Sequence, residues 1–115
     1  MIAVIFEVWP HADQKDNYLD MAIGLRSELS KVDGFISIER FESITEPGKM
    51  LSVSFFRDEE AVHQWRQLEK HREAQTAGRN TFFKNYRLRV AHVLRDYGMN
   101  ERDEAPADSR SLHEG

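Results

Sequence analysis

Apolar residues change their spacing in a fixed order along residues 2–95, and this order restricts the chain to few folds. Residues 2–9 form a β-branched and aromatic run that ends at Pro10, which is typical of a strand. Asp16 then suits the N-cap of a helix, and Gly34 is expected to end that helix. The helix is indicated by one apolar stripe at steps of three and four: Tyr18, Met21, Ala22, Leu25, Leu29 and Val32.

A hairpin, a second helix and a last strand follow. Residues 35–43 and 50–56 both alternate, and the segment TEPGK between them predicts a turn. Asp58 is expected to open the second helix, which runs toward Gly78. Residues 84–95 alternate again and predict the fourth strand. The stripe expected on the second helix is Ala61, Val62, Trp65, Leu68 and Arg72.

The order βαββαβ predicts an α+β fold of the ferredoxin-like class, with a four-stranded antiparallel sheet and two helices on one face. The opposite sheet face also carries apolar side chains, because Ala3, Ile5 and Trp9 alternate with the residues that face the helices. A second copy of the chain would cover that face. We therefore expect a homodimer.

Composition excludes several classes of function. A chain of 115 residues with a net charge of -4 is one domain and offers no basic field for nucleic acid. It has no cysteine, so disulfides, thiolate metal sites and a thiol nucleophile are excluded. The apolar start is interrupted by Glu7 and is too short to span a membrane. We expect a cytoplasmic protein.

The chain changes in composition near Gly98. Residues 1–97 contain every predicted element and are expected to form the folded domain. Residues 98–115 have few apolar side chains and more acids than bases. Because such a segment buries too little apolar surface to offset its ordering entropy, we expect a flexible acidic C-terminal tail.

The second helix and the strand after it carry the candidate site. His71 and Gln75 lie four residues apart on one helical face, near Trp65 and Leu68. One interpretation is that Trp65 and Leu68 pack on the sheet while the polar side chains are solvated. The other is a pocket between helix and sheet, apolar at its base, with His71, Gln75 and Tyr86 as its polar groups. No histidines have the spacing of metal ligands joined to a carboxylate cluster, so no metal site is expected.

The chain resembles the antibiotic biosynthesis monooxygenase family over nearly all of residues 1–97. The resemblance rests on length, element order and the pattern Trp65, His71, Ala74-Gln75, Gly78-Arg79, Phe83 and Tyr86. It implies a dimeric α+β barrel and a small monooxygenase that oxidises an aromatic or quinol-like metabolite with molecular oxygen and without a cofactor.

The resemblance also suggests roles for individual residues. His71 is the candidate general base, because imidazole titrates near neutral pH. Trp65 and Tyr86 complete the candidate catalytic set, and with Phe83 they would form an aromatic wall around the substrate. Arg72 or Gln75 would bind the substrate and stabilise a developing oxyanion.

Two alternatives stay open. Another group in the family binds and degrades haem, with an asparagine on the first strand, a tryptophan on the second helix and a histidine about ten residues later. Trp65 fits the tryptophan, but Gln75 stands at the histidine position and the first strand offers Glu7 in place of an asparagine. Haem binding would therefore need His71 as a substitute ligand. The second alternative is a non-catalytic dimeric binding or stress-response domain.

Overall fold

The computed structural model describes the backbone of residues 1–75 and 82–108, with their side chains except those of residues 70–75. The strands lie in the order β2-β3-β1-β4, and every neighbouring pair is antiparallel. The predicted ferredoxin-like α+β fold is confirmed. Its elements follow the predicted order: β1 (Ile2–Pro10), a short 3-10 helix η1 (Ala12–Gln14), α1 (Lys15–Leu29), β2 (Phe35–Glu42), β3 (Met50–Phe56), α2 (Glu59–Gln75) and β4 (Phe83–His92).

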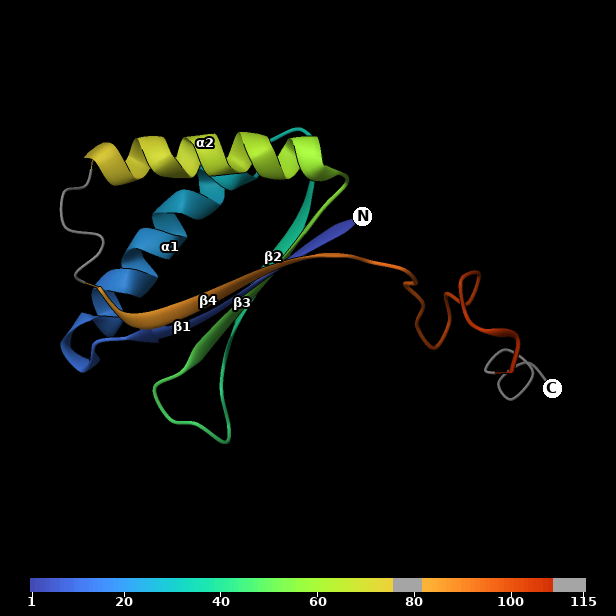
Figure 1. The fold of residues 1–115 in the computed structure, drawn as a ribbon, viewed down its shortest axis with the longest axis horizontal. Helices are drawn as coiled ribbons and strands as arrows, with labels where there is room; N and C mark the ends of the chain where they lie inside the picture. The colour runs from blue at the N-terminus through green and yellow to red at the C-terminus, as the bar shows by residue number, and fades with distance from the viewer. Residues whose placement is uncertain (76–81, 109–115) are drawn as a thin grey trace.

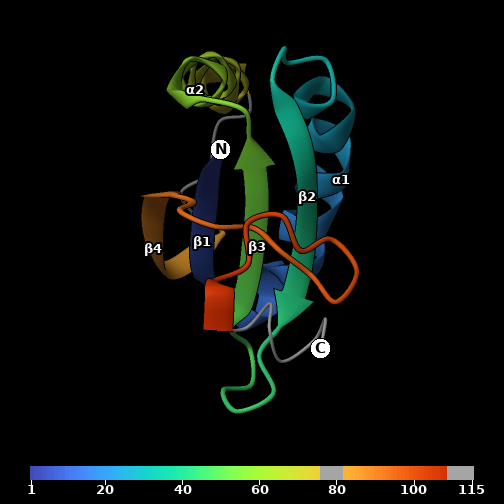
Figure 2. The same cartoon turned by 90° about the vertical axis from the view of Figure 1, so that its right-hand side faces the viewer.

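Both helices lie on one side of the sheet. Figure 1 shows α2 beyond α1 on that side, and the segment after β4 extending away from the sheet. Figure 2 shows the strands side by side, with α1 next to β2 and α2 seen end-on near the start of β1.

Two clusters of buried apolar side chains hold the helices to the sheet. The first gathers where α2 begins and α1 ends, and the second where α1 begins. The first consists of Ile2, Leu29, Val32, Phe56, Ala61 and Val62, with Val4, Phe35, Ile38 and Trp65 packed against it. The second consists of Val8, Tyr18 and Met50, with Phe6, Leu19, Met21 and Phe83 packed against it.

The start of α1 differs from its prediction. Asp16 lies inside the first turn, and Gln14 takes the N-cap position without a side-chain hydrogen bond. The cause is η1, in which the Gln14 backbone N–H donates to the His11 carbonyl oxygen at 2.9 Å and starts the turn early. An acid in the first turn still interacts favourably with the helix dipole.

Leu68 also departs from the predicted stripe of α2. Its side chain is 39% exposed, whereas Ala61 and Val62 are buried. The residues that face the sheet advance by four, from Ala61 to Trp65 to Glu69, so Leu68 lies at the margin of that face. A stripe assigned by apolar character alone therefore extends too far around the helix.

Candidate functional site

A pocket of about 300 Å³ lies between the helices and the sheet, where the two core clusters meet. All four strands and both helices contribute to its wall. Its volume is at the lower end of the range of about 300–1,000 Å³ that is common for small-molecule sites. Aliphatic side chains and one methionine make up the largest group in the wall: Val4, Met21, Ala22, Leu25, Ile38, Val62, Leu88 and Val90.

An aromatic cluster forms one part of the wall. The Phe83 ring lies 5.4 Å from the Tyr18 ring and 5.9 Å from the Phe6 ring, both nearly perpendicular to it. Tyr86 lies 5.7 Å from Phe6, also measured between ring centroids. Trp65 lines the same pocket from α2. Rings at these separations and angles attract one another, which fixes a rigid aromatic surface.

The sheet forms the floor of the pocket, and this floor carries polar side chains on β2 and β3. Ser52 and Ser54 are 7% and 6% exposed, and they alternate with residues on the far face of β3. Arg40 also lines the pocket, and its Nε is buried without a hydrogen-bond partner in the described part of the chain. A buried donor left unpaired costs about 1–3 kcal/mol, so such groups in a native core call for an explanation.

The strand register aligns these groups in one row. Arg40 pairs with Ser52, Ser52 with Phe6, and Phe6 with Leu88. Because residues in one row point to the same face, the floor is polar over β2 and β3 and apolar over β1 and β4. Two further charged residues, Arg66 and Glu69, line the pocket from α2.

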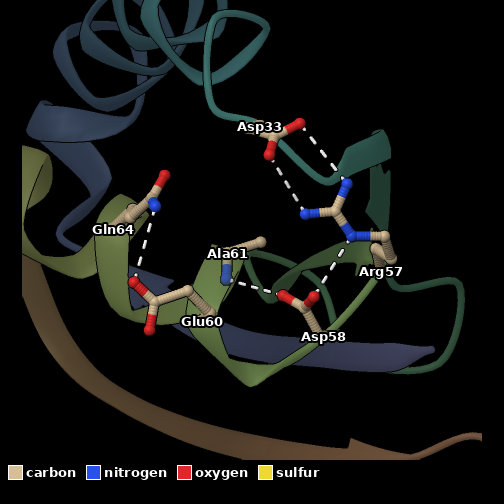
Figure 3. A network of polar contacts seen from close by, with 6 residues as sticks. All are labelled: Asp33, Arg57, Asp58, Glu60, Ala61 and Gln64. Atoms are coloured by element: carbon tan, nitrogen blue, oxygen red, sulfur yellow. Dashed lines mark hydrogen bonds and ion pairs between the residues drawn. The ribbon is translucent and has the colours of Figure 1, made fainter.

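A polar network fixes the start of α2 and so the position of Trp65 (Figure 3). Asp58 Oδ1 accepts a hydrogen bond from the Ala61 backbone N–H at 3.0 Å, which makes Asp58 the N-cap of the helix that it is expected to open. Arg57 Nε donates to Asp58 Oδ2 at 3.1 Å, and its two terminal nitrogens donate to Asp33 at 3.3 and 3.1 Å. The network therefore ties α2 to the turn that follows α1.

The Arg57 guanidinium changes the titration of its neighbours. Hydrogen bonding to Arg57 holds the pKa of Asp33 below its usual value. The pKa of Asp58 is lowered first by the Ala61 backbone N–H and then by Arg57. The two carboxylates in turn raise the pKa of Arg57.

Three of the predicted site residues lie together. Trp65, Phe83 and Tyr86 all line the pocket. The side chains of His71, Arg72 and Gln75 lie outside the described part of the chain. A pocket between α2 and the sheet is present, but its floor carries Arg40, Ser52 and Ser54 where the second interpretation expects an apolar base. The roles of the six residues stay predictions.

Sequence reasoning missed the polar floor. Ser52 and Ser54 stand between Met50 and Phe56 on the inward face of a strand, and small polar residues at alternate core positions are a signal of a lined cavity. Arg40 gives a similar signal, since it follows Ile38 on the same face of β2.

The described residues contain no group of three or more His, Cys, Asp or Glu side chains that would hold a metal ion. The described part likewise has no helix that is long and apolar enough to cross a membrane.

Comparisons with known proteins show which family the chain resembles. A family model described as antibiotic biosynthesis monooxygenase matches residues 1–77. The jasmonate monooxygenase ABM of Pyricularia oryzae is 45% identical over 101 residues, which are 88% of this chain and 47% of that protein. This chain therefore spans about half the length of that relative.

Solved structures support the fold. Rv0793 from Mycobacterium tuberculosis aligns with a TM-score of 0.73 at 17% identity, over 84% of this chain and 98% of that one. A variant of SnoaB, a cofactor-independent oxygenase from Streptomyces nogalater, aligns with a TM-score of 0.66 at 7% identity, over 83% of this chain and 94% of that one. These likenesses show the fold, and the family model that matches residues 1–77 shows that the chain belongs to the antibiotic biosynthesis monooxygenase family.

Proposed function

We propose that this protein is a small monooxygenase that oxidises an aromatic or quinol-like metabolite with molecular oxygen. The observation that carries the proposal is the aromatic cluster inside a pocket of about 300 Å³ in a member of this family. Flat rings pack well against Phe6, Phe83 and Tyr86, and a bound ring system would keep water from a carbanion that would otherwise be reprotonated.

The chemistry balances without a cofactor. A base removes a proton from an acidic phenol or enol, and the resulting anion transfers electrons to O2 and forms a carbon–oxygen bond. The peroxide then loses water and leaves a carbonyl, so that a CH2 group and O2 become C=O and H2O. The substrate supplies all the electrons, and the protein needs only to bind, to deprotonate and to exclude solvent.

The proposed roles of the three aromatic residues follow from their positions in the pocket, and those of the others follow from the family resemblance. Trp65, Phe83 and Tyr86 contact the ring, since all three line the pocket. We propose His71 as the general base and Arg72 or Gln75 as the group that stabilises the developing oxyanion.

Oxygen uptake by the purified protein tests the proposal. The panel of compounds comprises hydroxylated aromatics, quinols and jasmonate, the last because of the name of the fungal relative. Uptake of one O2 per product with one labelled oxygen atom in the product is the expected result. Binding of these compounds without any oxygen uptake would contradict the proposal and point to a binding domain instead.

The base is tested by substitution. We expect His71→Ala to lower turnover by about a hundredfold, with little change in Tm. His63→Ala is the matched control, because His63 is exposed on the same helix and contacts Gln67. Equal turnover in the two variants would remove His71 from the mechanism.

Haem binding is checked with the same variants. The described residues that line the pocket include no histidine, and His71 is the iron ligand that the sequence offers as a substitute. Titration with haemin should leave the Soret band of free haemin unshifted. A stoichiometric shift that is lost in His71→Ala would instead assign a haem site.

A further inference from the structure

We propose that the substrate of this pocket is an organic acid, whose carboxylate binds Arg40 together with the hydroxyls of Ser52 and Ser54. The inference deepens the proposed function by naming the substrate class. It rests on that function for the oxidation at the aromatic end, whereas the binding of an acid can be measured without turnover.

One buried donor of the polar floor has no partner. The Nε of Arg40 is buried and makes no hydrogen bond within the described part of the chain. Ser52 and Ser54 are almost fully buried on the neighbouring strand, and Ser52 pairs with Arg40 in the sheet. A carboxylate offers acceptor oxygens that satisfy a guanidinium and hydroxyls together, and this pairing is short and strong when both groups are removed from water.

The charges around the pocket also favour an anion. Arg40 and Arg66 line it together with one acid, Glu69, so the described wall carries one excess positive charge. Glu42, on the same face of β2 as Arg40, is held by Lys15, whose Nζ lies 2.7 Å from its Oε1. This ion pair directs the Glu42 carboxylate toward α1 and leaves Arg40 available to a ligand.

The row across the sheet sets the shape of the acid. Arg40 on β2 and Leu88 on β4 are separated by three strand spacings of about 4.8 Å, or about 14 Å between backbones. The long Arg40 side chain covers part of this distance. A carboxylate at the polar end therefore places a compact ring system of one or two rings against Phe6 and Tyr86, where the proposed oxidation takes place.

Binding of two matched probes tests the inference. The probes are 2-naphthoate and 2-naphthamide, which have nearly the same shape and differ in charge. Calorimetry on the full chain should show that 2-naphthoate binds about tenfold to a hundredfold more tightly, as expected for a desolvated charge-assisted contact. In Arg40→Met this preference should disappear, and in Ser52→Ala it should fall by a smaller factor.

Two arginine variants separate this site from general charge effects. Arg26→Met removes the same charge from an exposed position on α1 outside the pocket, and it should keep the preference. Loss of the preference in Arg66→Met but not in Arg40→Met would place the carboxylate at α2 and overturn the proposal. Circular dichroism of each variant confirms that the fold is retained.

The remaining outcomes are also decisive. Equal affinity for the two probes, or no binding of either at millimolar concentration, would overturn the inference. Failure of the monooxygenase proposal has a different signature, since the preference for 2-naphthoate would persist while no acid supported oxygen uptake.

Discussion

Gly34 lies where the turn after α1 meets the start of α2. Its φ is 95°, and a Cβ added there would lie 2.8 Å from the Cβ of Ala61, which is itself buried. Gly34→Ala therefore strains the backbone and pushes α2 away from the sheet. We expect its Tm to fall by about 10 °C or more, measured by thermal unfolding.

Gly48 provides a matched control for this variant. Its φ is 85°, but an added Cβ would meet nothing within 4 Å. Gly48→Ala therefore measures only the strain that a positive φ places on alanine. We expect its Tm to fall by about 4–8 °C or less. If Tm falls no further in Gly34→Ala than in Gly48→Ala, then α2 moves to make room for the added Cβ without a loss of stability.

Single residues also show where prediction from sequence ends. The pattern of the second helix and the last strand indicates Trp65 and Tyr86, the family resemblance adds Phe83, and all three line one pocket. The sequence does not predict that Arg40 and Ser52 belong to the pocket, because their contact depends on the register of two strands separated by a turn. Alternation predicts which face a residue occupies, whereas only the paired sheet shows which residues share a row.

The start of α2 depends on one side chain. Asp58 accepts the hydrogen bond from the Ala61 backbone N–H, and Ala at the same position would leave that N–H unpaired. We expect Asp58→Ala to lower Tm by about 4–8 °C, the shift for a typical cap in a domain of this size. Asp58→Asn retains a capping acceptor and should lose clearly less. Equal losses would mean that the charge, not the cap, stabilises α2.

The stabilisation from the ion pairs of Arg57 with Asp33 and Asp58 depends on pH. The pKa values of Asp33 and Asp58 are lowered in the folded protein, so their stabilisation is present above the unfolded pKa of about 3.9 and is lost as pH falls through the folded values. Arg57→Met removes a cause of both shifts. We expect its Tm to be lower than that of the unmodified protein at pH 6, with the difference shrinking below about pH 4.

The size of this effect is limited by solvent. The side chains of Arg57 and Asp33 are 57% and 82% exposed, so the ion pair is screened and the Tm difference at pH 6 should decrease in high salt. A difference that grows on acidification would reverse the assigned sign.

Among the elements, β3 has the bounds predicted from the sequence, and α1 does not. Met50–Phe56 is set off by a glycine turn and by a polar residue on either side, which are local signals. The start of α1 depends on η1, and the periodicity of residues 12–14 does not predict a 3-10 turn. Local chemistry thus predicts an element's bounds only where its own flanking residues determine them.

The molecule as a whole has one sheet face that the helices do not cover. Glu7 lies on it with its Oε2 3.1 Å from Arg89 Nη1 and its Oε1 3.4 Å from Lys49 Nζ. The bond to Arg89 is the main reason that the pKa of Glu7 is lowered. Apolar side chains surround this ion cluster: Ile5, Trp9, Leu51, Val53 and Phe55.

The segment after β4 extends away from the sheet (Figure 1). Within it, Ala105 is buried and its backbone N–H donates to the Arg102 carbonyl oxygen at 3.1 Å, which is a local turn. The Arg102 guanidinium lies 5.2 Å from the centre of the Tyr97 ring. The flexibility predicted for residues 98–115 stays a prediction, and residues 109–115 lie outside the described part.

The predicted homodimer uses the uncovered face. This face carries apolar side chains at alternate positions of β3, namely Leu51, Val53 and Phe55. A second copy of the chain would remove them from water and form a second layer on the sheet. Val53→Glu places a new carboxylate in the middle of that apolar surface, so it should shift the protein to monomers in sedimentation velocity at micromolar concentration. Ile23→Glu is the control, because Ile23 is 69% exposed on α1 and its substitution should leave the dimer intact. An unmodified protein that sediments as a monomer under these conditions would refute the prediction, and the apolar face would then need another partner.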